Sequence, residues 1–112
     1  MDKLLTSLIT LIFVASGSAK LLGLEFELDA FERWGYPIGF MYLTGVIEVA
    51  GGLVIWVKHF RLITSIGLSC VMIGAIATHL VNSEWPMLVI ASAILLLTLF
   101  STWRAKSDTK PV

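Results

Sequence analysis

The segment Gly45-Val46-Ile47-Glu48-Val49-Ala50-Gly51-Gly52 places one carboxylate, with glycines on both sides, inside an apolar stretch that runs from Ile38 to Val57. A charge turned toward hydrocarbon is costly, so a carboxylate at this depth indicates a helix that faces other helices. The segment therefore predicts a small membrane bundle with a polar spot in its interior.

The composition agrees with a membrane protein. Of the 112 residues, 57% are hydrophobic and 14% are charged, and the mean hydropathy is +0.90. A soluble domain carries about 25% charged residues and needs a polar exterior. The net charge is zero and the sequence has no Lys/Arg-rich run, so no basic surface for nucleic acid is expected.

Four apolar blocks approach the roughly 20 residues that a helix needs to cross about 30 Å of hydrocarbon. Backbone groups in lipid must pair internally, and no alternating strand pattern indicates a barrel. We expect an all-α fold, an antiparallel four-helix transmembrane bundle that forms a single domain over residues 1–112. Its predicted spans are residues 4–24, 38–57, 62–81 and 85–103, with a basic tail at 104–112.

The longest link joins the first two spans and has a helical pattern. Leu24, Leu28 and Phe31 fall at i, i+4 and i+7, with acidic residues assigned to the other side. This pattern predicts a short helix in the membrane interface, which Gly35 would end.

The distribution of Lys and Arg predicts the orientation. Both termini should be cytoplasmic, and the protein should lie in the inner (plasma) membrane. The amino-terminal run also resembles a cleavable secretion signal, but apolar character resumes at residues 21–24, so we expect a retained helix. The basic residues that fall on one side are Lys3, Lys58, Arg61, Arg104, Lys106 and Lys110.

Three ionisable residues fall within the outer half of the predicted spans. Lys20, Glu48 and His79 would lie roughly 6, 15 and 3 Å below the outer boundary at the usual helical rise. Side chains tilt toward the amino end of their helix, so Lys20 and Glu48 would lean toward each other's depth. With Thr44 and Tyr42 they form the predicted ligand-binding group.

These residues also allow a purely structural interpretation. Lys20 and Glu48 could be an ion pair that fixes helix register, or Lys20 could extend to the outer headgroups without contacting Glu48. His79 could be a solvated or hydrogen-bonded histidine. Whether Lys20 and Glu48 pair directly is left open at this stage.

Glycines are frequent where helices are expected to pack. Small residues let membrane helices approach closely, either within one bundle or between copies, and the sequence does not distinguish the two. The single cysteine, Cys70, is interpreted as a buried, inert thiol. The predicted packing residues are Gly17, Gly45, Gly51, Gly52, Gly67 and Gly74.

Motifs for bound cofactors are not found in the sequence. It has no paired-cysteine haem attachment, no phosphate-binding glycine loop and no metal-ligand spacing. We therefore expect no metal and no covalently bound cofactor, and any redox cofactor would be diffusible.

Four short motifs resemble the DoxX-like family of small four-helix membrane proteins. The resemblance runs from about Phe13 to Arg104. Relatives in the wider group are named for a subunit of a thiosulfate:quinone oxidoreductase, others act with membrane redox partners, and an animal branch acts as a receptor-assembly chaperone. The family pattern singles out Lys20, Glu48 and His79. The motifs are Gly17-Ser18-Ala19-Lys20-Leu21, Trp34-Gly35-Tyr36-Pro37, residues 45–52 and Ala77-Thr78-His79.

The leading hypothesis is a small subunit of a membrane redox assembly that binds a quinone or similar amphipathic molecule in an outer-half cavity. Lys20 and His79 would donate to a carbonyl oxygen, and Glu48 would relay a proton. The alternative is a non-enzymatic accessory, chaperone-like protein that packs against a larger membrane client in the lipid bilayer. Catalytic residues, enzymatic activity and formation of a homo-oligomer are left open.

Overall fold

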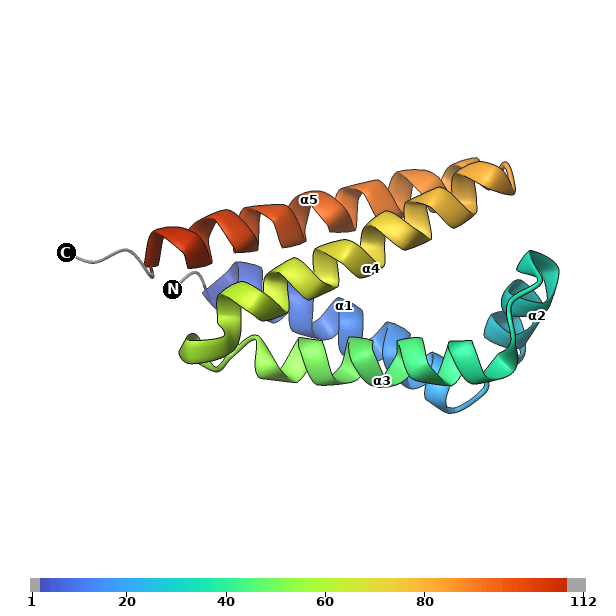
Figure 1. Cartoon of the computed structure of the whole chain (residues 1–112), viewed down its shortest axis with the longest axis horizontal. Coiled ribbons are helices and arrows are strands. Elements are labelled where there is room, and N and C mark those ends of the chain that lie inside the picture. The colour runs from blue at the N-terminus through green and yellow to red at the C-terminus, as the bar shows by residue number, and fades with distance from the viewer. Residues whose placement is uncertain (1–2, 109–112) are drawn as a thin grey trace.

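The computed structural model describes residues 3–108, and these residues form helices and no strand (Figure 1). The predicted all-α class is confirmed, and a short helix lies between the first two long ones. Gly35 ends this short helix in the left-handed conformation, with φ of 81°. The elements are α1 (Lys3–Leu21), α2 (Glu25–Trp34), α3 (Ile38–Val54), the 3₁₀ turn η1 (Lys58–Phe60), α4 (Arg61–Val81) and α5 (Trp85–Asp108).

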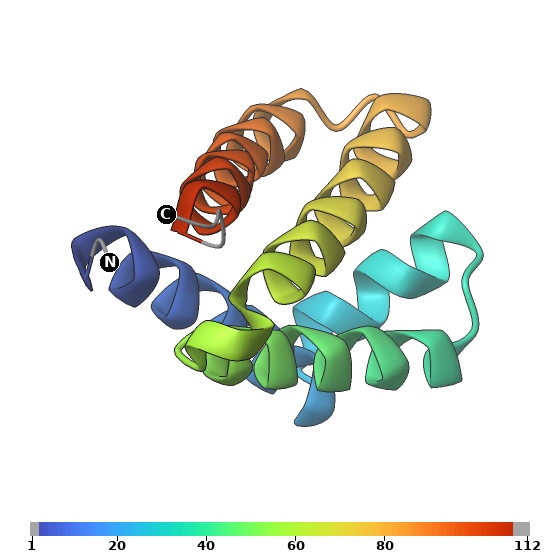
Figure 2. The ribbon, with the colours of Figure 1, turned by 60° about the vertical axis from the view of Figure 1, so that its left-hand side comes forward.

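The long helices form two antiparallel pairs. Helix α1 packs mainly against α3, and α4 packs mainly against α5. The pairs lie close together where α1 begins and α5 ends, and they diverge toward the end that holds α2 (Figures 1 and 2). A hydrophobic core joins the pairs through Leu5, Ile9, Phe13, Ile55, Leu68, Met72 and Ala91.

Glycines bring α1 and α3 into backbone contact. A Cβ added to Gly17 would lie 2.6 Å from the carbonyl oxygen of Gly45 and 2.9 Å from the backbone nitrogen of Val49. One turn farther along α3, the hydroxyl of Thr10 donates to the carbonyl oxygen of Gly52 at 2.7 Å. The two helices can approach this closely only because side chains are missing at the crossing.

The other glycines named from the sequence divide into two groups. A Cβ on Gly51 would lie 2.7 Å from Leu68 of α4, and one on Gly52 would lie 3.1 Å from Val14 of α1. Gly67 and Gly74 have no atom of the described chain within 4 Å of such a Cβ, and both are exposed on α4. Within the described residues, these two glycines therefore serve no helix contact. The prediction that Cys70 is buried is wrong, because this residue lines the open pocket and is exposed.

The second predicted span ends earlier than its apolar pattern indicates. Helix α3 stops at Val54 instead of continuing to Val57. The buried guanidinium of Arg61 donates to the carbonyl oxygens of Ile55 at 3.0 Å and Trp56 at 3.1 Å. These bonds satisfy carbonyls that a longer helix would have used, so the chain turns there.

Three helical segments are long and apolar enough to cross a membrane: residues 3–21, 58–81 and 85–107. Helix α3 is apolar but has only 17 residues, and it would extend about 25 Å at the usual rise. Helix α5 continues through the first part of the predicted basic tail as far as Asp108. The rest of that tail, including Lys110, lies outside the described residues.

Candidate functional site

A pocket of about 950 Å³ lies between the two helix pairs, with residues of α2 at its wide end. Its walls are mostly apolar, and every one of the five α-helices contributes to them. Ile12, Ile47, Met72 and Ile94 represent the apolar lining from α1, α3, α4 and α5. The polar lining residues gather in two clusters.

The first cluster, which we call the inner cluster, is centred on Lys20. Its ammonium nitrogen lies 2.8 Å from Oε1 of Glu48, 3.3 Å from Oε2 of Glu27 and 2.8 Å from Oγ of Ser16. The Ser16 hydroxyl donates to Oε2 of Glu48 at 3.0 Å. The side chains of Lys20, Glu27 and Glu48 are only 12%, 11% and 5% exposed. Lys20 and Glu48 therefore form a direct, buried ion pair, which answers the question that the sequence left open.

Local structure explains why these groups meet. Lys20 lies in the last turn of α1, with Ser16 one turn before it on the same face. Gly45 lets the two helices approach, since a Cβ there would lie 3.0 Å from Cβ of Lys20. Glu27 comes from the first turn of α2, on the face that also buries Phe31 one turn later.

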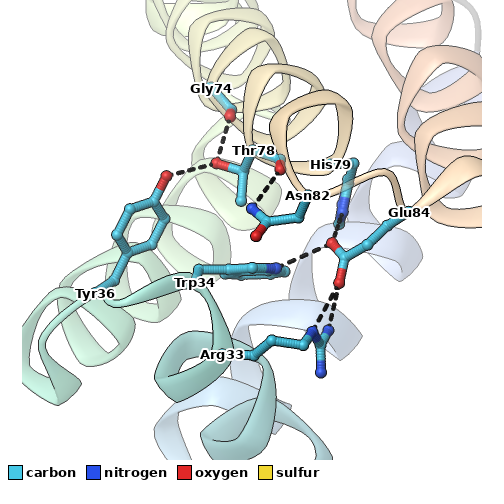
Figure 3. Close-up of polar contacts among 8 residues, drawn as sticks. All are labelled: Arg33, Trp34, Tyr36, Gly74, Thr78, His79, Asn82 and Glu84. Atoms are coloured by element: carbon cyan, nitrogen blue, oxygen red, sulfur yellow. Dashed lines mark hydrogen bonds and ion pairs between the residues drawn. The ribbon is translucent and has the colours of Figure 1, made fainter.

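The outer cluster is centred on Glu84, in the turn between α4 and α5 (Figure 3). Its carboxylate lies 2.8 Å from Nδ1 of His79 and accepts from Nε1 of Trp34 at 2.9 Å and from Nε of Arg33 at 2.9 Å. Beside it, the hydroxyls of Tyr36 and Thr78 lie 2.8 Å apart. These contacts join the end of α2 to the α4–α5 pair.

The hydrogen bonds of the outer cluster act on the acidity of Glu84. Burial raises the pKa of this carboxyl, but hydrogen bonds from His79, Arg33 and Trp34 and the charge of Arg33 outweigh that effect. The net result is a pKa below its ordinary value of 4.5. Glu84 is therefore held in the ionised form, the form that accepts these bonds.

The structure does not bring all five predicted ligand-binding residues together. Lys20 and Glu48 are in contact, whereas His79 pairs with Glu84 elsewhere in the same pocket. Thr44 lines the pocket, but its hydroxyl donates to the carbonyl oxygen of Phe40 at 2.8 Å. Tyr42 is exposed and is not among the lining residues; its hydroxyl lies near Gly23 instead.

Sequence reasoning missed Glu27 and Glu84. It assigned Glu27 to the solvent side of α2, whereas the structure buries this residue. The signal was present, because Glu27 lies four residues before Phe31 and so shares its face. Glu84 has no comparable signal, since a lone acidic residue in a turn is usually solvated.

Aromatic side chains line the pocket where α2 turns into α3. The ring centroids of Phe31 and Trp34 are 5.1 Å apart, and those of Tyr36 and Phe40 are 5.6 Å apart.

Within residues 3–108, no three His, Cys, Asp or Glu side chains group closely enough to hold a metal ion. The clusters can thus bind a molecule through hydrogen bonds and charge, with aromatic surface beside them.

Comparison with known proteins places this architecture in a family. The sequence model of the DoxX-like family matches residues 4–101. The chain belongs to the DoxX-like family. This DoxX-like chain is also similar to the uncharacterized protein YdgD of Bacillus subtilis (strain 168), with 24% identity over 93 residues that cover 80% of this chain and 82% of the relative. No solved structure matches it. The family and the three long apolar helices together make it a membrane protein.

Proposed function

We propose that this DoxX-like protein is a multi-pass inner-membrane protein that binds a quinone or a similar amphipathic molecule between its helix pairs. It would act as a small subunit of a membrane redox assembly. The apolar part of the ligand would lie along the walls lined by α3, α4 and α5, and its polar end would reach the cluster of Lys20, Glu27 and Glu48.

One observation carries this proposal: a largely apolar pocket of about 950 Å³ ends on a buried ion cluster. Ligand sites in proteins are typically concave, mostly apolar and equipped with a few placed polar groups. Ionisable residues inside a membrane are costly and usually mark a functional site. A bundle that needed only stability would fill this space with apolar side chains.

The proposed orientation follows from the distribution of basic residues. Lys3 and Lys106 lie at the start of α1 and near the end of α5, and Lys58 lies in η1, all at the narrow end of the molecule. The positive-inside rule assigns that end to the cytoplasm. The wide end, with α2 and the pocket mouth, would then face outward.

The test is to purify the protein from native membranes and to analyse the bound lipids by mass spectrometry. We expect one quinone or related amphipathic molecule to be enriched over the bulk membrane. Glu48→Gln should reduce the enrichment, whereas Glu32→Gln, an exposed acid on α2, should retain it. Folded wild-type protein with no enriched amphipathic molecule would rule the function out.

A second candidate function, a non-enzymatic accessory protein, is favoured by the surface of α4 at Gly67. This glycine is exposed, does not line the pocket, and has no atom of the described residues within 4 Å of an added Cβ. Such a face suits close packing against a client helix or another copy. Gly67→Leu should leave the fold intact and remove co-purifying membrane proteins, and an unchanged set of partners would count against this role.

A further inference from the structure

The hydrogen-bond donors around the pocket are already used within the protein. An ammonium group has three N–H donors. Lys20 donates to Ser16 at 2.8 Å and to Glu27 at 3.3 Å, and its ammonium nitrogen forms an ion pair with Glu48 at 2.8 Å. Lys20 can therefore donate to a ligand only by giving up one of these contacts.

The hydroxyl donors of the lining residues are also committed. The single hydrogen of Ser16 is directed at the Glu48 carboxylate, and that of Thr44 at the carbonyl oxygen of Phe40. Thr78 donates to the carbonyl oxygen of Gly74 at 2.9 Å, so Tyr36 must be the donor in its contact with Thr78.

The nitrogen donors follow the same pattern. Trp34 Nε1 and Arg33 Nε donate to Glu84. An ionised carboxylate only accepts, so Nδ1 of His79 carries a hydrogen and donates it to Glu84. The other N–H groups of the Arg33 guanidinium lie at the rim of the pocket, on a side chain that is 56% exposed. The thiol of Cys70 is a weak donor.

Acceptors, in contrast, are left over in the inner cluster. Oε2 of Glu27 accepts from Lys20, while Oε1 has no partner among residues 3–108. Every buried side-chain oxygen or nitrogen of the described residues has a hydrogen-bond partner. Because Oε1 of Glu27 has none, this oxygen is not fully buried and borders open space. The two carboxylates of Glu27 and Glu48 offer more lone pairs than Lys20 and Ser16 fill.

We propose that the pocket recognises an uncharged amphipathic molecule through a hydroxyl or N–H group that donates to the carboxylates of Glu27 and Glu48. This inference rests on the proposed function and narrows its ligand class. Of a quinone couple, the reduced form with its phenolic hydroxyls fits the site, while a carbonyl oxygen would meet mainly acceptors. An anionic headgroup is disfavoured as well, because two carboxylates share one ammonium.

A pair of matched probes tests the inference. The molecules para-decylphenol and para-decylanisole have the same ring and tail, and they differ in that the phenol carries a donating hydrogen. Each is titrated into the wild-type protein in phosphatidylcholine nanodiscs. Occupancy is measured as protection of Cys70, the single cysteine and a lining residue, from N-ethylmaleimide. A hydrogen bond to a charged group predicts protection by the phenol at about tenfold lower concentration.

Substitution of Glu27 tests the assignment of the acceptor. Glu27→Gln replaces a charged acceptor by a neutral amide and leaves Glu48 in place, so the preference for phenol over anisole should fall several-fold. Glu32→Gln is the matched control on the exposed side of α2, and it should keep the wild-type preference. The ratio of the anisole and phenol concentrations that protect Cys70 is measured in the wild-type protein. It therefore remains decisive even where Glu27→Gln fails to fold.

The outcomes separate the two proposals. Equal protection by both probes, or stronger protection by the anisole, overturns the donor inference and leaves an amphipathic-molecule site in place. Reaction of Cys70 at an unchanged rate with both probes overturns the pocket as a binding site, and both proposals fail. A phenol preference that is undiminished in Glu27→Gln overturns the role of Glu27.

Discussion

Lys20 is the residue that makes the inner cluster possible, because its ammonium lies within 3.3 Å of two buried carboxylates. Two carboxylates in an apolar setting repel each other and lose hydration, so each depends on the shared cation. The same arrangement leaves Oε1 of Glu27, a residue that lines the pocket, without a partner among residues 3–108. Stability and ligand recognition thus depend on the same few atoms.

Replacing Lys20 alone should destabilise the fold more than replacing Lys20 and Glu48 together. Lys20→Met leaves Glu27 and Glu48 without their cation, and breaking a buried ion pair typically costs about 3–5 kcal/mol. The double substitution Lys20→Met/Glu48→Gln should recover part of that loss. The stability of both variants is measured as the free energy of unfolding in detergent micelles. A double variant no more stable than Lys20→Met would contradict the buried ion pair between Lys20 and Glu48.

Glu84 should make the attachment of α2 sensitive to acid. Its folded-state pKa lies below 4.5, so its contacts contribute fully above that value and are lost as the pH falls below it. The protection factors of α2 amides, which correct hydrogen exchange for its slower intrinsic rate in acid, should therefore fall at acidic pH. Glu84→Gln should show low protection factors already at neutral pH, with little further change on acidification. Equal pH dependence in both proteins would exclude Glu84 as the cause.

At the scale of single residues, the sequence predicted part of the candidate site. The depths of Lys20 and Glu48 and the tilt of their side chains indicated that they could meet, and they do. The partner of His79 could not be predicted, because Glu84 lies in a turn whose path depends on tertiary contacts. Tyr42 was included from its place in the span, but one apolar helix gives little information about which of its faces points inward.

At the scale of elements, the contact between α1 and α3 depends on glycine. Gly17 and Gly45 face each other with their backbones in contact, whereas Gly67 of α4 faces open space. Sequence alone marks all three as small residues on a membrane helix. Only the arrangement of the helices separates glycines needed for packing from those left free.

Gly17→Ala and Gly67→Ala should therefore differ sharply. The added methyl group at Gly17 must push the α3 backbone away, and such overpacking typically costs about 1–3 kcal/mol. At Gly67 the same change meets no atom and should be neutral or slightly stabilising, since alanine favours helix more than glycine does. Thermal unfolding of the two variants in the same detergent measures the difference. Equal stability would contradict the described α1–α3 contact.

Arg61 defines the end of α3, a boundary that hydropathy alone placed too late. Its buried guanidinium binds two carbonyl oxygens of the turn, so Arg61→Met keeps the aliphatic packing and leaves those acceptors unpaired. We expect a loss of about 1–3 kcal/mol in the free energy of unfolding. An exposed lysine in the same turn, changed as Lys58→Met, should have little effect. Similar losses in both variants would refute the capping role.

At the scale of the whole molecule, the two helix pairs diverge toward the end that holds α2 (Figure 2). A pocket lies between them, and residues of α2 line it. Composition, segment length and the apolar pattern of the first link were enough to predict an all-α membrane bundle with a short helix between the first two long ones. They could not predict the divergence, because four apolar helices could equally form a closely packed bundle. The pocket arises from pairwise packing, which hydropathy does not record.

The most direct test of the pocket is photolabelling with a diazirine analogue of para-decylphenol in nanodiscs, read out by peptide mass spectrometry. We predict labels on lining residues from both helix pairs, such as Ile47 and Ile94, and loss of these labels when unlabelled para-decylphenol is added. Labels confined to residues outside the pocket, such as Leu53 and Leu96, and insensitive to competition would contradict an amphipathic-molecule site between the helix pairs.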